Sequence, residues 1–192
     1  MTSPRVLVPL APGFEEIEAM AIIDVLRRAE VEVVTAGLDS DQVEGSHGVT
    51  VRADRRIEDC DMADFSAIVL PGGMPGAQHL HDDARVQERL VQAHERGLLI
   101  GAICAAPMAL VPGGITRDRR VTSYPSFKDR VPAGAWVDEN VVEDGPVVTS
   151  RGVGTALAFA LTLVRRLRDP SVADRLAGIM LVRPAQPAKS SQ

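Results

Sequence analysis

Cys104 is the residue of this sequence best suited to act as a nucleophile. It follows the uncharged apolar run 98–103 and lies among small residues in the stretch AICAA, residues 102–106. Small side chains around a nucleophile are typical of a tight strand-to-helix turn, which lifts the side chain out of the sheet. The start of the following helix would offer free N–H groups and a partial positive charge that favour the thiolate. The alternative is a buried structural cysteine, which is common for this residue type.

Glu18 is the carboxyl group that could work with this cysteine. In helical register its neighbours three, four and seven residues further on are all apolar: Ala21, Ile22 and Val25. A carboxyl group on that face points into the protein, where burial would keep it protonated and able to donate. The alternative is that Glu18, like Glu15 and Glu16, only favours the N-terminus of a helix through its dipole. For Glu15 and Glu16 this alternative is the better interpretation.

The segment 71–76, PGGMPG, follows an apolar run that predicts a strand. Such a loop exposes backbone N–H groups beside the carboxyl edge of a sheet, as an anion or oxyanion site needs. Its glycine spacing is not that of a dinucleotide-binding loop. A plain turn is an equally good interpretation.

The remaining cysteine and the histidines give weaker signals. Cys60 is surrounded by acidic residues, which disfavour its thiolate, so we interpret it as an incidental surface or loop cysteine. None of the four histidines adjoins Cys104, which argues against a hydrolase triad. His79 and His81 lack two further ligands at zinc spacing, so the sequence predicts no metal site. His47, in a loop with glycines, is the histidine that could belong to a site.

Composition excludes several functional classes. The 192 residues are 45% hydrophobic and 24% charged, as in one globular domain. Aromatic residues make up 3%, which argues against a surface that stacks the bases of single-stranded nucleic acid. The net charge is −5 and there is no basic run, so electrostatics give no basis for binding nucleic acid or an anionic membrane. Two cysteines cannot form a disulfide framework, and the apolar start is too short for a signal peptide. We therefore expect a cytoplasmic protein.

Strands alternate with helices along the chain, which predicts a doubly wound α/β sandwich. The predicted strands are 5–10, 31–36, 67–70 and 98–103, with a possible short edge strand at 49–53. The predicted helices are 15–29, one capped by Asp82 and ending near 97, 105–111, 155–167 and 170–180. Within the first helix, Ile17, Met20, Ala21 and Val25 form one apolar face, which Ile22, Ile23 and Leu26 widen. Residues 38–48 are expected to be a loop, 121–149 a hairpin-like excursion, and 183–192 a disordered tail behind a single domain, 1–182.

Four motifs in this order resemble the ThiJ/PfpI superfamily, and most closely its parkinsonism-associated deglycase branch and bacterial relatives. They are GFEEIE at 13–18, LPGG at 70–73, AICAAP at 102–107 and TSRGVGT at 149–155. The resemblance implies a flavodoxin-like three-layer sandwich with a mostly parallel sheet, usually a homodimer, without a cofactor. It also implies that Cys104 is the reactive cysteine, that Glu18 is hydrogen-bonded to it, and that backbone N–H groups surround the reacting oxygen, those of Gly72, Gly73 and Ala105.

Three departures from the family pattern are visible. Ala105 stands where protease-like members have a histidine after the cysteine, so proteolysis is not expected. Tyr124 stands where the animal proteins have a histidine near the cysteine, which makes it, with His47, a candidate pocket residue. Val153 replaces the proline usual between the two glycines of the last motif.

The resemblance implies a glutathione-independent glyoxalase or deglycase that acts on a small carbonyl substrate of the methylglyoxal type or on glycated amines. In the alternative, Cys104 is oxidised and the protein is a redox-responsive chaperone or stress sensor. Both functions need a reactive thiol, so the motifs do not separate them.

Overall fold

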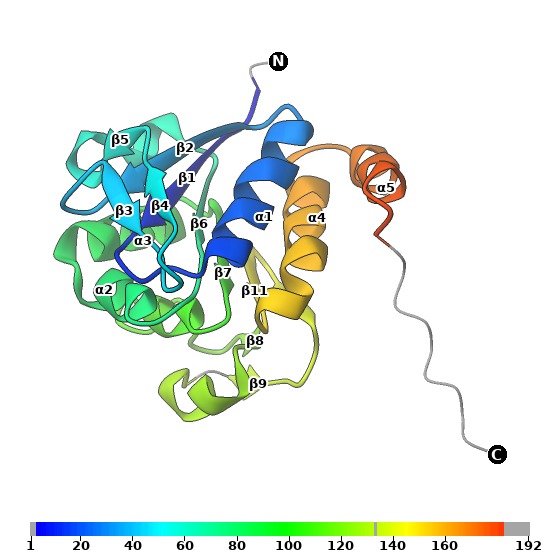
Figure 1. Cartoon of the computed structure of the whole chain (residues 1–192). Helices are drawn as coiled ribbons and strands as arrows, with labels where there is room; N and C mark the ends of the chain where they lie inside the picture. Colours follow the sequence, from blue (N-terminus) through cyan, green and yellow to red (C-terminus); the bar gives the residue numbers. More distant parts are fainter. Residues whose placement is uncertain (1–2, 133, 183–192) are drawn as a thin grey trace.

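A seven-stranded sheet forms the centre of the computed structural model, which describes residues 3–132 and 134–182 (Figure 1). The strand order is β10-β11-β7-β6-β1-β2-β5, and every neighbouring pair is parallel except β10 and β11. The strands are β1 (Arg5–Leu10), β2 (Glu32–Gly37), β5 (Arg55–Arg56), β6 (Ala67–Leu70), β7 (Leu99–Ile103), β10 (Val141–Asp144) and β11 (Val147–Ser150). A mostly parallel sheet must be covered on both faces, which accounts for its nearly continuous apolar strands.

Helices cover both faces of this sheet. On one side lie α1 (Glu16–Arg28) and α4 (Ala156–Leu167), with α5 (Pro170–Ile179) packed against α4; on the other lie α2 (Gly76–Asp82) and α3 (Ala84–Glu95) (Figure 1). Strand β1 divides its side chains between the two layers, because successive residues of a strand point to opposite faces. Val6 and Val8 pack with the α1 and α4 side, and Leu7 packs with the α3 side. The flavodoxin-like three-layer sandwich is therefore confirmed.

The helix expected to begin at Asp82 is α3, whose cap lies one residue later, at Asp83. A short helix that was not predicted, α2, precedes it and ends at Asp82. The side chain of Asp83 accepts hydrogen bonds from the N–H groups of Arg85 and Val86, so it is the N-cap. The sequence did not predict α2, because a seven-residue helix with four polar residues has no clear apolar period.

The segment between β2 and β6 was predicted incorrectly. Its expected loop contains β3 (Gln42–Glu44), which pairs with β4 (Thr50–Arg52) in a separate antiparallel sheet. The expected edge strand is thus β4 of this hairpin, and the strand at the edge of the main sheet is β5. Two short 3-10 turns follow β5, at Ile57–Asp59 and Met62–Asp64.

Residues 105–155 also differ from the expectation. The helix after Cys104 is only a 3-10 segment, Ala106–Leu110. The excursion is limited to the short parallel pair β8 (Arg120–Val121) and β9 (Ala135–Trp136) with a 3-10 segment, Pro125–Arg130, between them. The rest, β10 and β11, belongs to the main sheet, where β11 lies beside β7. A further 3-10 turn, Val153–Thr155, leads into α4.

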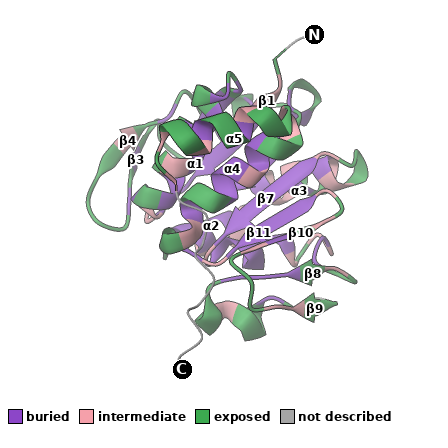
Figure 2. Cartoon of the chain, turned by 90° about the vertical axis from the view of Figure 1, so that its right-hand side faces the viewer, coloured by how far each residue is buried: buried purple, intermediate pink, exposed green. Residues whose placement is uncertain are grey.

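Only part of the predicted apolar face of α1 is buried. Val25 and the residues expected to widen the face, Ile22, Ile23 and Leu26, are buried, whereas Ile17 and Met20 are 58% and 38% exposed. Figure 2 shows that α1 carries both buried and exposed residues. The helix carries more apolar residues than one face can hold, and the sheet with α4 covers only the stripe that contains Ile22 and Leu26. Within the described residues, no helix has the length and apolar character needed to cross a bilayer. The predicted tail, 183–192, lies outside the described residues.

Candidate active site

Cys104 lies in a strained turn at the carboxyl end of β7. Its φ angle is +63°, in the left-handed region that residues with a side chain seldom adopt. Two hydrogen bonds hold this conformation: the N–H of Cys104 donates to the carbonyl of Ser150 at 2.9 Å, and the N–H of Tyr124 donates to the carbonyl of Cys104 at 2.8 Å. A conformation of this kind costs on the order of 1–3 kcal/mol and persists where the surroundings fix it. The turn directs the thiol away from the sheet, as the small neighbours predicted.

Glu18 is fully buried in the first turn of α1, next to this thiol. Its Oε2 accepts a hydrogen bond from the N–H of Gly72 at 2.9 Å. Its Oε1 has no hydrogen-bond partner in the part of the chain that the structure describes, and the thiol of Cys104 lies beside the carboxyl group. Burial raises the pKa of Glu18 to about 7, although the hydrogen bonds from Gly72 and Cys104 oppose the shift. The inward carboxyl group expected from the helical spacing is therefore present.

The electrostatics of Cys104 differ from the expectation. Burial, and then the charge of Glu18, raise the pKa of the thiol to about 12, while hydrogen bonds from the N–H groups of Gly73 and Ala105 act in the opposite direction. The expected lowering relied on a helix dipole, but only a five-residue 3-10 segment follows the cysteine. The sequence could not reveal that Glu18, which was expected to donate a proton to the thiolate of Cys104, would also raise the pKa of that thiol through its negative charge.

The loop after β6 brings the glycines against both groups. A Cβ atom on Gly72 would lie 2.6 Å from Cβ of Cys104 and 2.7 Å from Oε2 of Glu18, so only glycine fits between them. The three predicted N–H groups divide into two sets. That of Gly72 donates to Glu18, whereas those of Gly73 and Ala105 act on the sulfur of Cys104, where they lower the pKa of the thiol. Gly73 has a φ of +91°, a conformation that favours glycine.

A cavity of about 650 Å³ opens in front of the sulfur. Its wall contains Cys104, half-exposed Tyr124 and the 3-10 turn that leads into α4; the full lining is Cys104, Tyr124, Pro125, Ser126, Asn140, Arg151, Gly152, Val153, Gly154 and Thr155. Arg151 also pairs with Asp138. Sequence reasoning missed Arg151 and Asn140 as pocket residues, although Arg151 stands inside the motif 149–155. Nothing in the sequence distinguishes it from the many other arginines.

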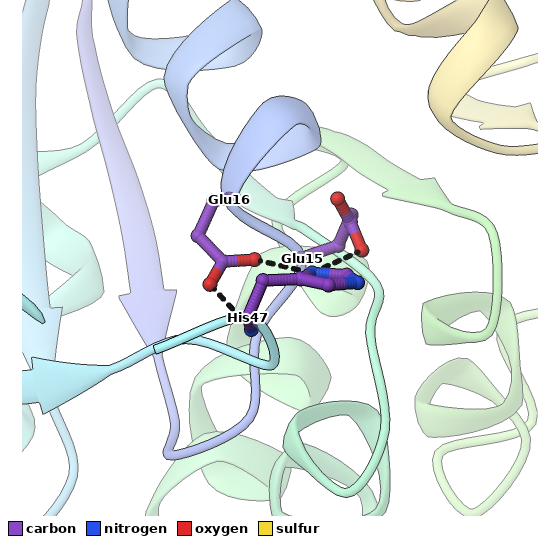
Figure 3. A group of neighbouring side chains, drawn as sticks. All are labelled: Glu15, Glu16 and His47. Carbon is purple, nitrogen blue, oxygen red and sulfur yellow. Dashed lines mark hydrogen bonds and ion pairs between the residues drawn. The ribbon is translucent and has the colours of Figure 1, made fainter. Parts of the chain in front are cut away.

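His47 does not line this cavity. Its Nδ1 lies 3.0 Å from Oε2 of Glu16, and its backbone N–H donates to Oε1 of the same residue at 2.6 Å (Figure 3). Glu16 is 9% exposed, and the hydrogen bonds from His47 and Val49 lower its pKa to about 2 against the effect of burial. Glu16 lies in the first turn of α1, as the helix-end interpretation requires, but its side chain also holds the loop that contains His47.

Cys60 is 2% exposed and packs in the core on the α3 side, so it is not a surface residue. Its pKa is raised, first by burial and only weakly by Asp59. The sequence argument also expected a raised pKa for this thiol, but it gave neighbouring carboxylates as the cause, whereas the main cause is burial.

Comparison with known proteins was made for the sequence and for the fold. The model of the DJ-1/PfpI family matches residues 4–166. The Parkinson disease protein 7 homolog of Danio rerio is 39% identical over 95% of this chain and 100% of that protein. The glutathione-independent glyoxalase DJR-1.2 of Caenorhabditis elegans is 37% identical over 84% of this chain and 87% of that protein.

The solved structures include a similar fold from an animal. DJ-1beta of Drosophila melanogaster has a TM-score of 0.92 and 37% identity, over 95% of this chain and 100% of that chain. A plant relative is longer: the chain is 37% identical to protein DJ-1 homolog A of Arabidopsis thaliana and spans 47% of that protein's length.

Proposed function

Since the chain belongs to the DJ-1/PfpI family, we propose that it is a cysteine-dependent, cofactor-free glyoxalase or deglycase. Its substrates would be dicarbonyls of the methylglyoxal type or the adducts that they form with amines. One observation carries the proposal: the thiol of Cys104, in its strained turn, lies beside the buried carboxyl group of Glu18 and faces a cavity. The name of the glutathione-independent glyoxalase relative from Caenorhabditis elegans supports the same class of reaction.

The proton shared by Glu18 and Cys104 determines which form reacts. The two groups cannot both be ionised near neutral pH, because the charge of one raises the pKa of the other. When the pair carries one negative charge, that charge resides on sulfur if the carboxyl group keeps its proton. The N–H groups of Gly73 and Ala105 favour this arrangement, since both lower the pKa of the thiol. The proposed reactive form is thus a thiolate next to a protonated Glu18.

The chemistry follows from these positions. The thiolate adds to the aldehyde carbon of methylglyoxal, and protonated Glu18 gives its proton to the new oxyanion, which forms a hemithioacetal and leaves Glu18 as a carboxylate. Before that proton arrives, the N–H groups of Gly73 and Ala105 can stabilise the negative charge that has moved from sulfur to oxygen. The carboxylate of Glu18 then removes the proton from this carbon and returns it to the adjacent carbon, while the hydroxyl proton passes to the neighbouring carbonyl oxygen, which leaves a thioester. Water hydrolyses the thioester, releasing lactate and restoring the thiol.

Turnover of methylglyoxal by the reduced protein, without glutathione, tests the proposal. Formation of lactate that is lost in Cys104→Ser would support it. A deglycase would in addition release free amine from a preformed methylglyoxal–amine adduct, which the same samples can measure. No turnover of either substrate by the reduced protein would refute the enzymatic proposal and leave the redox sensor or chaperone, for which oxidation of Cys104 would be the relevant reaction.

We further propose that the chain forms a homodimer. Helix α1 exposes the apolar residues Ile17 and Met20, α4 exposes Leu157, and the two helices are neighbours (Figure 1). Both helices begin at the same end of the sheet, because each follows a parallel strand. Large apolar side chains exposed on neighbouring helices support a protein–protein interface there.

The proposal extends to the domain organisation, the cellular location and the kind of partner. We propose one domain over residues 1–182, since the central sheet takes strands from β1 to β11. We also propose a cytoplasmic location, because the reaction needs Cys104 to stay reduced. The net charge of −5 supports a small-molecule partner over a nucleic acid or an anionic membrane.

A further inference from the structure

A second group of titratable side chains gathers where α1 begins, outside the cavity at Cys104 (Figure 3). The Nδ1 atom of His47 lies 3.0 Å from Oε2 of Glu16 and 3.6 Å from Oε2 of Glu15. One possible ligand atom from each residue lies within 4.8 Å of the others. We propose that Glu15, Glu16 and His47 form a binding site for a divalent transition-metal ion of the Zn²⁺ class.

The spacing of the ligand atoms fits such an ion. Zn²⁺ binds nitrogen and carboxylate oxygen at about 2.0–2.2 Å, which places two ligands of a tetrahedron roughly 3.3 Å apart. The separations from His47 to Glu16 and Glu15, 3.0 and 3.6 Å, lie on either side of this value. An ion would replace the proton between imidazole and carboxylate without a large movement of either side chain.

The loop between β3 and β4 fixes Glu16 in advance. Its Oε1 accepts hydrogen bonds from the backbone N–H groups of His47, at 2.6 Å, and Val49, at 3.4 Å. This leaves Oε2 turned toward the imidazole. A Cβ atom on Gly45 would lie 2.4 Å from the Glu16 carboxyl carbon, so the loop closes around the carboxylate only with glycine there. Preorganisation by such outer contacts is typical of metal sites.

Two further features favour a metal ion as the occupant. The side chains of Glu15 and Glu16 are only 12% and 11% exposed, so solvent screens their two negative charges poorly. The hydroxyl of Ser46 lies 3.4 Å from Oε2 of Glu15 and 3.2 Å from Oε2 of Glu16, where it can hydrogen-bond both ligands. The imidazole side chain is 70% exposed, which leaves an entry path and room for a water ligand.

The ligand chemistry selects among cations. An imidazole nitrogen with two carboxylates suits Zn²⁺, Co²⁺ or Ni²⁺, whereas Mg²⁺ and Ca²⁺ prefer oxygen ligands alone. The sequence predicted no metal site, because only His79 and His81 are close together along the chain and they lack two further ligands at zinc spacing. The loop that contains His47 returns to the start of α1 only in the folded chain.

Titration calorimetry with ZnCl₂ on the full chain tests this site. We expect one equivalent to bind, and His47→Ala to weaken the affinity by about tenfold or more, since even the loss of an outer-shell partner costs 10–100-fold. His47 is exposed, so this substitution should leave the fold intact. His81→Ala is the matched control, because His81 lies 2.7 Å from a single carboxylate, that of Asp82, and should not change binding.

The thiol of Cys104 could also bind the ion, so a second experiment must distinguish it from the site at His47. The visible absorption spectrum of bound Co²⁺ does this, because it shows whether sulfur is a ligand. Visible bands without a sulfur-to-cobalt charge-transfer band, unchanged in Cys104→Ser and lost in His47→Ala, would support the proposal. The proposal is overturned if Zn²⁺ does not bind, if binding survives His47→Ala, or if it requires Cys104. In those cases His47 is only an ion-pair partner of the two carboxylates. None of these outcomes depends on turnover of methylglyoxal.

Discussion

The carboxyl group of Glu18 and the thiol of Cys104 lie together in one buried position, where the charge of the carboxylate opposes ionisation of the thiol. The pKa of the carboxyl group is raised to about 7 and that of the thiol to about 12. Between these values the pair shares one negative charge. The position of its remaining proton therefore decides whether sulfur is a nucleophile.

The pH dependence of stability should report the buried carboxyl group. The pKa of Glu18 is about 7 in the folded chain and 4.5 in an unfolded one, so the folded state binds the proton more tightly. Its stabilising effect is fully present below pH 4.5 and is lost as the pH rises through about 7. The loss is on the order of 3 kcal/mol.

Urea unfolding of the natural chain and of Glu18→Gln, at pH 4.5 and pH 7.5, measures this effect. The natural chain should lose stability relative to the variant over that range. A difference between the two proteins that stays constant with pH would show that Glu18 titrates normally.

Glu18→Gln should also affect turnover. The amide keeps the size of the side chain but cannot carry a proton, so turnover of methylglyoxal should fall on the order of 10²-fold or more. Mass spectrometry should still find Cys104 alkylated by iodoacetamide. The control is Asp24→Asn, on the exposed side of the same helix; Glu16→Gln does not serve, because Glu16 holds the loop around His47. Equal, small losses in both variants would remove Glu18 from the mechanism.

Gly72→Ala should damage both the site and the fold. The added methyl group would lie 2.6 Å from Cβ of Cys104 and 2.7 Å from Oε2 of Glu18. We expect a loss of about 1–3 kcal/mol of stability, as for other overpacked substitutions, together with loss of turnover. Gly178→Ala, in α5, meets nothing within 4 Å and should stabilise the helix by about 0.5–1 kcal/mol. If both variants unfold at the same temperature as the natural chain, the contact at Gly72 is not tight.

Ile17→Glu should disrupt the proposed dimer. Sedimentation of the natural chain at micromolar concentration should give about twice the chain mass of 20.5 kDa. Ile17 is 58% exposed, so a glutamate there can stay in water in the monomer but not in an apolar interface. Ile179→Glu is the control, since Ile179 is 65% exposed on α5, away from the start of α1. A natural chain that sediments as a monomer would contradict the proposal directly.

Local sequence was sufficient for the central elements and for the two residues at the centre of the site. The uncharged run before Cys104 predicted β7, and the small residues around it predicted the strained turn. The helical spacing around Glu18 predicted an inward carboxyl group. These features depend on neighbours within about two helical turns, so the chain itself carries the information.

Tertiary structure decided what depends on residues far apart in the chain. Ile17 and Ile22 are equally apolar, and only the packing of α1 against the sheet and α4 decides that Ile22 is buried. Glu16 becomes the centre of a hydrogen-bond network only because the loop with His47 folds back onto it. The pKa of Cys104 depends on burial and on Glu18, which is 86 positions away in the sequence, because charge acts across space and not along the chain.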